Sequence, residues 1–118
     1  MAVASTRKVV IVYSGDFAAS FAFSAASNSA SPADIDILSL AAGNNTIMLP
    51  TGGSSVKGAT IIPPSDNLQT ITLKGVNGDT GIALHKTDPA SISFDTVPPA
   101  SFVLNAGGIV TGLRILWS

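Results

Sequence analysis

An Asn77-Gly78 pair lies at the centre of residues 69–86, QTITLKGVNGDTGIALHK, where aliphatic residues alternate with small or polar ones. A two-residue type I′ turn needs positive φ at both central positions, and Asn-Gly adopts this conformation at the lowest steric cost. The alternation on both sides agrees with such a turn, because the large aliphatic residues then meet on one face. The stretch therefore predicts a β-hairpin in which Gly78 has positive φ.

The register of this hairpin follows from counting outward from the turn. The predicted cross-strand pairs are Leu73 with Ile82, Ile71 with Leu84, and Thr72 with Ala83. We expect the aliphatic face to be buried as a unit, and it consists of Ile71, Leu73, Ile82 and Leu84. The opposite face, which carries Thr70, Thr72 and His85, is expected to face solvent.

Short apolar or alternating segments separated by turn residues make up most of the remaining chain. These segments are residues 9–13, 20–25, 34–40, 46–49, 59–62, 91–95, 101–105 and 109–117. In residues 34–40 we expect Ile35 and Ile37 to face inward, followed by a change of phase at Leu38 that indicates a bulge or a strand changing sheets. In residues 109–117 the odd positions are the expected inward face. Short strands spaced roughly every 8 to 12 residues, without helices, predict a single all-β domain over residues 1–118, an antiparallel two-sheet β-sandwich that is jelly-roll-like.

The composition agrees with this fold class and raises a question about the surface. Hydrophobic residues make up 46% of the chain and charged residues only 11%, whereas about 25% charged is typical. Every acidic residue is Asp and Gln69 is the sole Gln, so good helix formers are scarce. Two interpretations stay open: a neutral, hydroxyl-rich outer surface, or an outer surface that neighbouring subunits cover.

Charge, cysteine content and hydropathy exclude several function classes. The net charge of −1 provides no basic footprint, which argues against direct recognition of nucleic acid. The absence of cysteine excludes disulfides, thiolate chemistry and thiol-based zinc sites. The first apolar run, residues 9–13, is too short for the core of a signal peptide, and no run approaches the roughly 18 apolar residues of a membrane span. We therefore expect a soluble protein without a membrane partner.

Candidate catalytic and ligand-binding residues are few. His85 is the sole histidine and no Ser lies in a G-x-S-x-G context, so no nucleophile–base pair is evident. A surface or interface position is favoured for His85 over a role as a ligand or base. The glycines of residues 75–81, GVNGDTG, are not followed by a helix of the kind that a phosphate-binding loop uses. We predict no enzyme activity, no catalytic residue, no cofactor and no metal site.

Two terminal segments carry apolar residues on both faces, although a two-layer sandwich buries only its inner face. The predicted oligomer interface consists of the outer residues Val10, Val12, Val110 and Leu116, together with Trp117. For Trp117 two positions stay open, at the end of the core or as an anchor in a neighbouring subunit. The low charged fraction also favours a homo-oligomer, with a trimer as the preferred state.

The runs KGVNGDTGIALHKTDPASISFD (residues 74–95), SFVLNAGG (101–108) and GLRILWS (112–118) resemble small all-β proteins encoded among the structural genes of tailed bacteriophages. The composition is similar to that of phage decoration proteins and fibre modules. The resemblance implies a virion component in the capsid decoration, neck or tail, soluble in the host cytoplasm before assembly, with other virion proteins as partners. The alternative is a carbohydrate-binding β-sandwich module, which one Trp and one Tyr support poorly.

Overall fold

The computed structural model describes residues 7–16, 19–24, 35–50 and 56–118. These residues form ten β-strands and no helix, which confirms the predicted all-β class. The strands are β1 (Lys8–Tyr13), β2 (Ala19–Ser24), β3 (Ile35–Leu40), β4 (Gly43–Met48), β5 (Gly58–Ile62), β6 (Ile71–Lys74), β7 (Ile82–Leu84), β8 (Ala90–Ser93), β9 (Ser101–Ala106) and β10 (Val110–Trp117). Among the described residues there is no helix that could cross a membrane.

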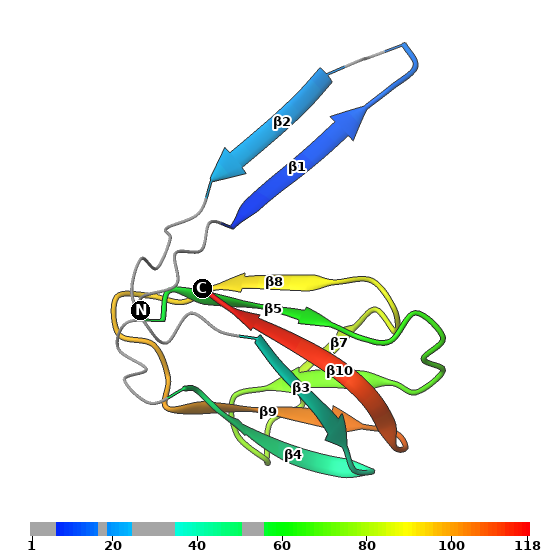
Figure 1. The fold of residues 1–118 in the computed structure, drawn as a ribbon, viewed down its shortest axis with the longest axis vertical. Helices are drawn as coiled ribbons and strands as arrows, with labels where there is room; N and C mark the ends of the chain where they lie inside the picture. Colours follow the sequence, from blue (N-terminus) through cyan, green and yellow to red (C-terminus); the bar gives the residue numbers. More distant parts are fainter. Residues whose placement is uncertain (1–6, 17–18, 25–34, 51–55) are drawn as a thin grey trace.

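Strands β3 to β10 form the two layers of a sandwich (Figure 1). Sheet I has the order β3-β10-β5-β8 and sheet II the order β4-β9-β6-β7, and every pairing is antiparallel. Consecutive strands lie in opposite sheets, except for the hairpin β6–β7. Eight strands wound between two sheets in this way form a jelly roll. The predicted jelly-roll sandwich is therefore confirmed for this part of the chain.

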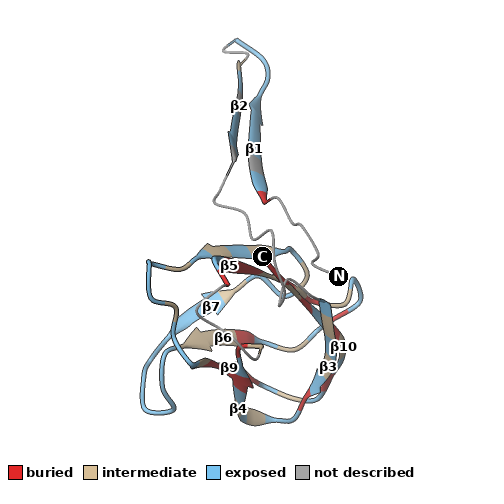
Figure 2. Cartoon of the chain, turned by 60° about the vertical axis from the view of Figure 1, so that its left-hand side comes forward, coloured by how far each residue is buried: buried red, intermediate tan, exposed pale blue. Residues whose placement is uncertain are grey.

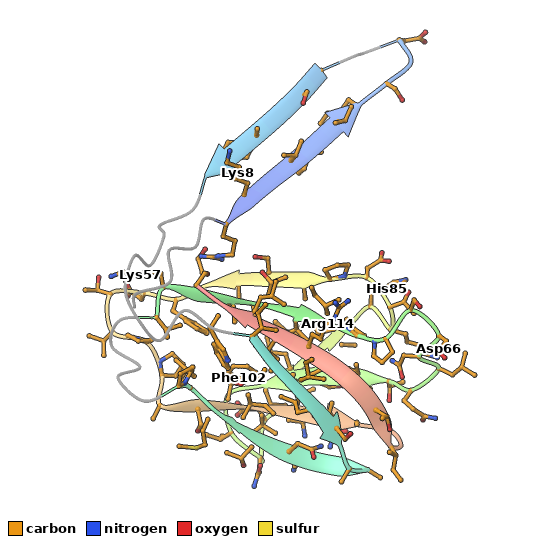
Figure 3. All side chains as sticks on the ribbon, viewed as in Figure 1. Lys8, Lys57, Asp66, His85, Phe102 and Arg114 are labelled. Atoms are coloured by element: carbon orange, nitrogen blue, oxygen red, sulfur yellow. The ribbon has the colours of Figure 1, made fainter. Side chains whose placement is uncertain are left out.

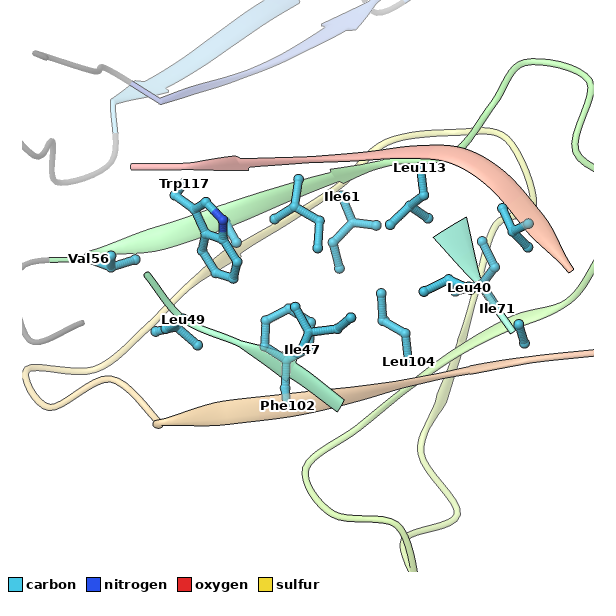
Figure 4. Packing of buried hydrophobic residues seen from close by; sticks show 14 residues of the cluster. Leu40, Ile47, Leu49, Val56, Ile61, Ile71, Phe102, Leu104, Leu113 and Trp117 are labelled. Carbon is cyan, nitrogen blue, oxygen red and sulfur yellow. The ribbon is translucent and has the colours of Figure 1, made fainter. Parts of the chain in front are cut away.

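The core lies between the two sheets and is almost entirely aliphatic (Figure 4). Its fully buried large side chains are Leu40, Val56, Ile61, Ile71, Leu104, Val110, Leu113 and Ile115. Trp117 and Phe102 close one end, with their ring centroids 6.0 Å apart. The Trp117 indole N–H donates to Asp36 Oδ2 at 2.8 Å, so the polar edge of the buried ring has an acceptor.

The inward face of β10 differs from the prediction because the strand contains a bulge. The pairing with β3 shifts between Val110 and Leu113, and Gly112 has a φ of 84°. An additional residue at a bulge changes which side chains face the core. Val110 is consequently buried, whereas Ile109 and Thr111 are exposed, and regular alternation resumes from Leu113. The expectation that Val110 faces outward was wrong for this reason.

The inward face of β3 was also predicted wrongly. Ile35 and Ile37 are 58% and 72% exposed, whereas Leu40 is buried and Leu38 packs against the core. The strand keeps one phase throughout, and the chain changes sheets only after Leu40. The inward position of Asp36 is possible because the Trp117 indole donates a hydrogen bond to its carboxylate.

The hairpin of residues 69–86 has the predicted register but a different turn. Ile71 pairs with Leu84 and Leu73 with Ile82, as counted from the sequence. Neither Asn77 nor Gly78 has positive φ, so a type I′ turn is absent and that prediction was wrong. Residues 75–81 instead form a longer loop, in which Asp79 Oδ2 accepts hydrogen bonds from the Gly75 and Val76 amides at 3.0 Å each. The positive φ of 79° falls on Gly81.

Burial on this hairpin follows the position of each strand in sheet II. Ile71 is fully buried, and Leu73 and Leu84 pack against the core, as predicted. Ile82 is 68% exposed, so the expectation that it is buried with them was wrong. The physical reason is that β7 is the edge strand of sheet II and leaves one side of Ile82 uncovered. His85 is exposed, as expected from its place on the other face.

Replacing Asp36 with alanine should destabilise the sandwich by about 1.5–3 kcal/mol, because the buried indole N–H of Trp117 loses its charged acceptor. Asp36→Asn keeps an acceptor oxygen and should cost less. Equilibrium denaturation followed by Trp117 fluorescence measures both. Asp66→Ala, at an exposed turn, is the control and should change stability by no more than about 0.5 kcal/mol. Equal stability of Asp36→Ala and wild type would contradict a stabilising role for this bond.

Candidate functional site

The hairpin β1–β2 stands apart from the sandwich and forms a two-stranded sheet of its own (Figure 1). We call this hairpin the arm. Its register pairs Lys8 with Ser24 and Tyr13 with Ala19. Figure 2 shows that most of its described surface is exposed, in contrast to the buried strands of the sandwich. A two-stranded hairpin alone is marginally stable in water at best. Apolar residues on such an arm therefore favour a further layer that covers it.

The two faces of the arm differ in composition. The register places Ile11, Tyr13 and Phe23 on one face, which we call the aromatic face, and their exposed fractions are 47%, 50% and 60%. The other face, which we call the valine face, carries Lys8, Val10 and Val12. Val10 and Val12 are exposed, as the predicted interface requires. The aromatic face carries the larger apolar groups.

Arg7 attaches the base of the arm to sheet I. Its Nη1 donates to the backbone oxygen of Ile92 at 2.7 Å and lies 3.4 Å from Ser91 Oγ. The guanidinium occupies the space that a Cβ at Gly58 would fill. Its Nε and Nη2 have no acceptor among the described residues, and desolvation by burial lowers the pKa of Arg7. The residue that precedes the arm is therefore a buried cationic side chain that packs on β5 and β8.

The outer face of sheet I carries a group of aliphatic residues on three neighbouring strands. We call it the aliphatic patch, and it consists of Ile35, Ile37, Ile62 and Leu116. Arg114 lies between Ile37 and Ile62 in the register and is exposed (Figure 3). The described residues provide no carboxylate within ion-pairing distance of it. The patch is thus apolar with one cationic group at its centre.

The predicted interface residues divide between the surface and the core. Val10 and Val12 lie on the arm and Leu116 is half-buried on the outer face of sheet I. Val110 and Trp117 are each only 2% exposed, so their side chains belong to the subunit's own core and not to an outer surface. For Trp117 the structure decides between the two open positions in favour of the core.

The sequence reasoning missed the aromatic face and the outward isoleucines of β3. The sequence does contain a usable feature, since the apolar run 9–13 is followed closely by the alternating run 20–25. In the structure β1 and β2 pair only with each other, in the register Ile11 with Phe21. Pairing residues 9–13 with the alternating run 20–25 as a separate hairpin would have placed Ile11, Tyr13 and Phe23 on one face. The sequence was instead interpreted as one sandwich in which these strands belong to the main sheets.

The outer face of sheet II is polar and internally hydrogen-bonded. Asn105 Nδ2 donates to Asn44 Oδ1 at 2.8 Å, and Lys74 Nζ lies 3.4 Å from the same oxygen. The loop of residues 75–81 reaches this network, since Asn77 O accepts from Asn44 Nδ2 at 3.5 Å and from Lys74 Nζ at 3.4 Å. The polar groups of this network satisfy one another, and Met48, 64% exposed at the end of β4, is the large exposed apolar side chain beside them on this face.

His85 has a structural role in a turn. Its Nδ1 accepts hydrogen bonds from the backbone amides of Thr87 at 3.1 Å and Asp88 at 2.9 Å. This leaves Nδ1 as an acceptor in the neutral ring, with the proton on Nε2. The residue lies at the end of the sandwich away from the base of the arm (Figure 3). The described residues contain no group of three or more His, Cys, Asp or Glu side chains that could hold a metal ion.

A cleft of about 460 Å³ opens between the edges of the two sheets. Its apolar lining consists of Leu73, Ile82, Ile92, Phe94 and Phe102. Two charged residues, Lys74 and Asp79, complete the wall, and both are already engaged in hydrogen bonds within sheet II and its loop. A ligand site normally presents free polar groups that converge on the ligand. This cleft therefore carries no assignable chemistry.

Comparison with known proteins leaves the family open. No protein-family model matches this chain, and no curated protein or solved structure matches it either. The fold assignment rests on the strand order of the two sheets.

Proposed function

We propose that this protein is a non-enzymatic structural component of a bacteriophage virion, in the capsid decoration, neck or tail, which assembles as a symmetric homo-oligomer. The arm is the single observation that carries this proposal. It exposes apolar side chains on both faces and pairs with no other strand of the described chain. A subunit with such an arm is stabilised when a neighbour covers it.

Association can supply the free energy that the two-stranded arm lacks on its own. At about 25 cal/mol per Å², covering roughly 300 Å² of apolar arm surface contributes about 7 kcal/mol before the cost of association. The low charged fraction of 11% is consistent with subunits that conceal part of their surface. A trimer is the favoured state, and other virion proteins are the expected further partners.

The buried Trp117 supports a virion component over the alternative of a carbohydrate-binding module, whereas the fold is compatible with both. Jelly rolls with this strand arrangement occur in viral capsid proteins, although lectins and cupins share them, so this is a fold-level analogy. The single Trp lies in the core and is 2% exposed, so it provides no platform for a sugar ring. The free subunit is expected in the host cytoplasm before assembly, and the assembled protein in the virion.

The double variant Val12→Asp, Phe23→Asp tests the assembly. The two substitutions place charge on opposite faces of the arm, so they oppose a contact made by either face. We expect wild-type protein at about 100 μM to elute as an oligomer by gel filtration with light scattering, and the variant as a monomer with unchanged β-rich circular dichroism.

Val97→Asp is the matched control, because Val97 is 83% exposed in the loop after β8 and does not belong to the arm. Its mass should equal that of the wild type. A monodisperse wild-type monomer of 11.9 kDa would overturn self-assembly. Immunoblotting of purified phage particles with an antibody against the protein tests the virion location independently, and its absence from particles would contradict that part of the proposal.

A further inference from the structure

We propose that the aromatic face of the arm docks on the aliphatic patch of sheet I in a second copy of the chain. This inference rests on the proposed function and names the surface that receives the arm. The two surfaces are the aromatic face, with Ile11, Tyr13 and Phe23, and the aliphatic patch with Arg114 at its centre.

The chemistry of the two surfaces is complementary. The aromatic face carries no charged group among its described residues, and its rings can stack on the Arg114 guanidinium. Arg114 lies among aliphatic side chains and has no ion pair in the described chain. Stacking on the rings of a second copy therefore breaks no ion pair within its own subunit. The valine face would bring Lys8 toward Arg114, and this like-charge approach is unfavourable.

The other large surface of the sandwich is a poorer receiver. The outer face of sheet II presents Asn44, Asn105 and Lys74, whose polar groups bond to one another. An apolar arm on this face would remove water from these polar groups and would offer them no new hydrogen-bond partner. The outer face of sheet I has hydroxyls and aliphatic groups beside Arg114, and its second cation, Arg7, is already buried on β5 and β8, so covering the patch costs less.

The dimensions of the arm require that more than one contact forms per assembly. Each strand of the arm has six residues, which corresponds to about 20 Å in length and about 10 Å in width for the pair. One face therefore covers roughly 200 Å², well below the roughly 800 Å² per partner of a stable interface. In a closed symmetric assembly every copy donates one arm and receives another, which raises the surface covered on each copy to roughly 400 Å².

The absence of cysteine permits a direct test by cross-linking, since two introduced thiols are the only ones in the chain. Ala19 pairs with Tyr13 and shares its face, and Thr60 pairs with Leu116 on the outer face of sheet I. The full-length variant Ala19→Cys, Thr60→Cys is treated with a short bis-maleimide and separated on a denaturing gel. We expect most of the protein in covalent dimers and larger species.

Two control variants change one surface at a time. Ser20→Cys, Thr60→Cys moves the arm thiol to the valine face, and Ala19→Cys, Thr46→Cys moves the other thiol to the outer face of sheet II. Both should give far fewer covalent dimers. Each single-cysteine variant reports on contact between identical positions and should stay mainly monomeric on the gel.

The outcomes separate this inference from the proposed function. An oligomer by light scattering whose cross-links favour either control would overturn the docking surface and leave the assembly intact. A cross-link confined to single chains, seen as altered mobility at monomer mass, would show that the arm folds back on its own sheet and would also overturn it. A monomer by light scattering would overturn the inference and the assembly together.

Discussion

Replacing Gly81 with valine should destabilise the protein by roughly 3 kcal/mol or more, because the left-handed backbone and the close packing both oppose a side chain. Gly81 has a φ of 79°, and a Cβ there would lie 2.5 Å from the Leu73 backbone oxygen and 2.7 Å from Thr72 Cγ2. Both contacts belong to the neighbouring strand β6, which cannot move without disturbing its pairing with β9. Equilibrium denaturation in guanidinium measures the loss.

Gly78 is the matched control from the same loop. It lacks positive φ and a Cβ there would meet no atom within 4 Å. Gly78→Ala should therefore change the free energy of unfolding by no more than about 0.5 kcal/mol. This expectation replaces the one from the Asn-Gly pattern, which assigned the strained position to Gly78. Comparable losses at Gly78 and Gly81 would show that the loop has another conformation.

Truncating Ile71 to alanine should destabilise the protein by about 3–5 kcal/mol, because the side chain is fully buried in a packed aliphatic core. Ile71 lies on β6 and its neighbours include both sheets of the sandwich (Figure 4). The same substitution at Ile82, which is 68% exposed on the edge strand β7, should cost less than about 1 kcal/mol.

The comparison of these two isoleucines isolates burial, since they belong to the same hairpin and lose the same atoms. Both variants should be measured at one protein concentration, because assembly makes apparent stability depend on concentration. Equal losses would mean that a partner subunit covers Ile82. Combining each alanine substitution with the arm variant Val12→Asp, Phe23→Asp should then abolish the loss of stability at Ile82 and leave the loss at Ile71 unchanged.

The sequence was sufficient for the fold class and for most strand positions. Alternation at period two, turn residues at regular intervals and the lack of helix formers are local properties of the chain. The register of β6–β7 was also predictable, because only one pairing brings the aliphatic residues of both strands onto the same face. That pairing holds although the connecting turn differs, since a longer loop centred on the same pair leaves the count unchanged.

The conformation of that loop depended on contacts that the sequence pattern does not display. Asp79 folds back to accept the amides of Gly75 and Val76, and this local bonding competes with the tight Asn-Gly turn. The bulge at Gly112 had a similar effect on β10, where it exchanged the faces of Val110 and Ile109. Each is a choice between local geometries of similar energy, and packing against neighbouring strands selects one.

Only the tertiary structure decided which apolar residues form the core and which form the surface. Alternation says that Ile35 and Leu38 face opposite sides of a strand, but not which side meets the other sheet. The arm is the clearest case, since Ile11 and Phe23 have a core-like composition yet lie outside the sandwich. Their position depends on long-range strand pairing, which brings β3 and β10 together and leaves β1 and β2 with each other. The free energy of strand pairing depends on all the strands of a sheet together, so it cannot be assigned to any one segment of the sequence.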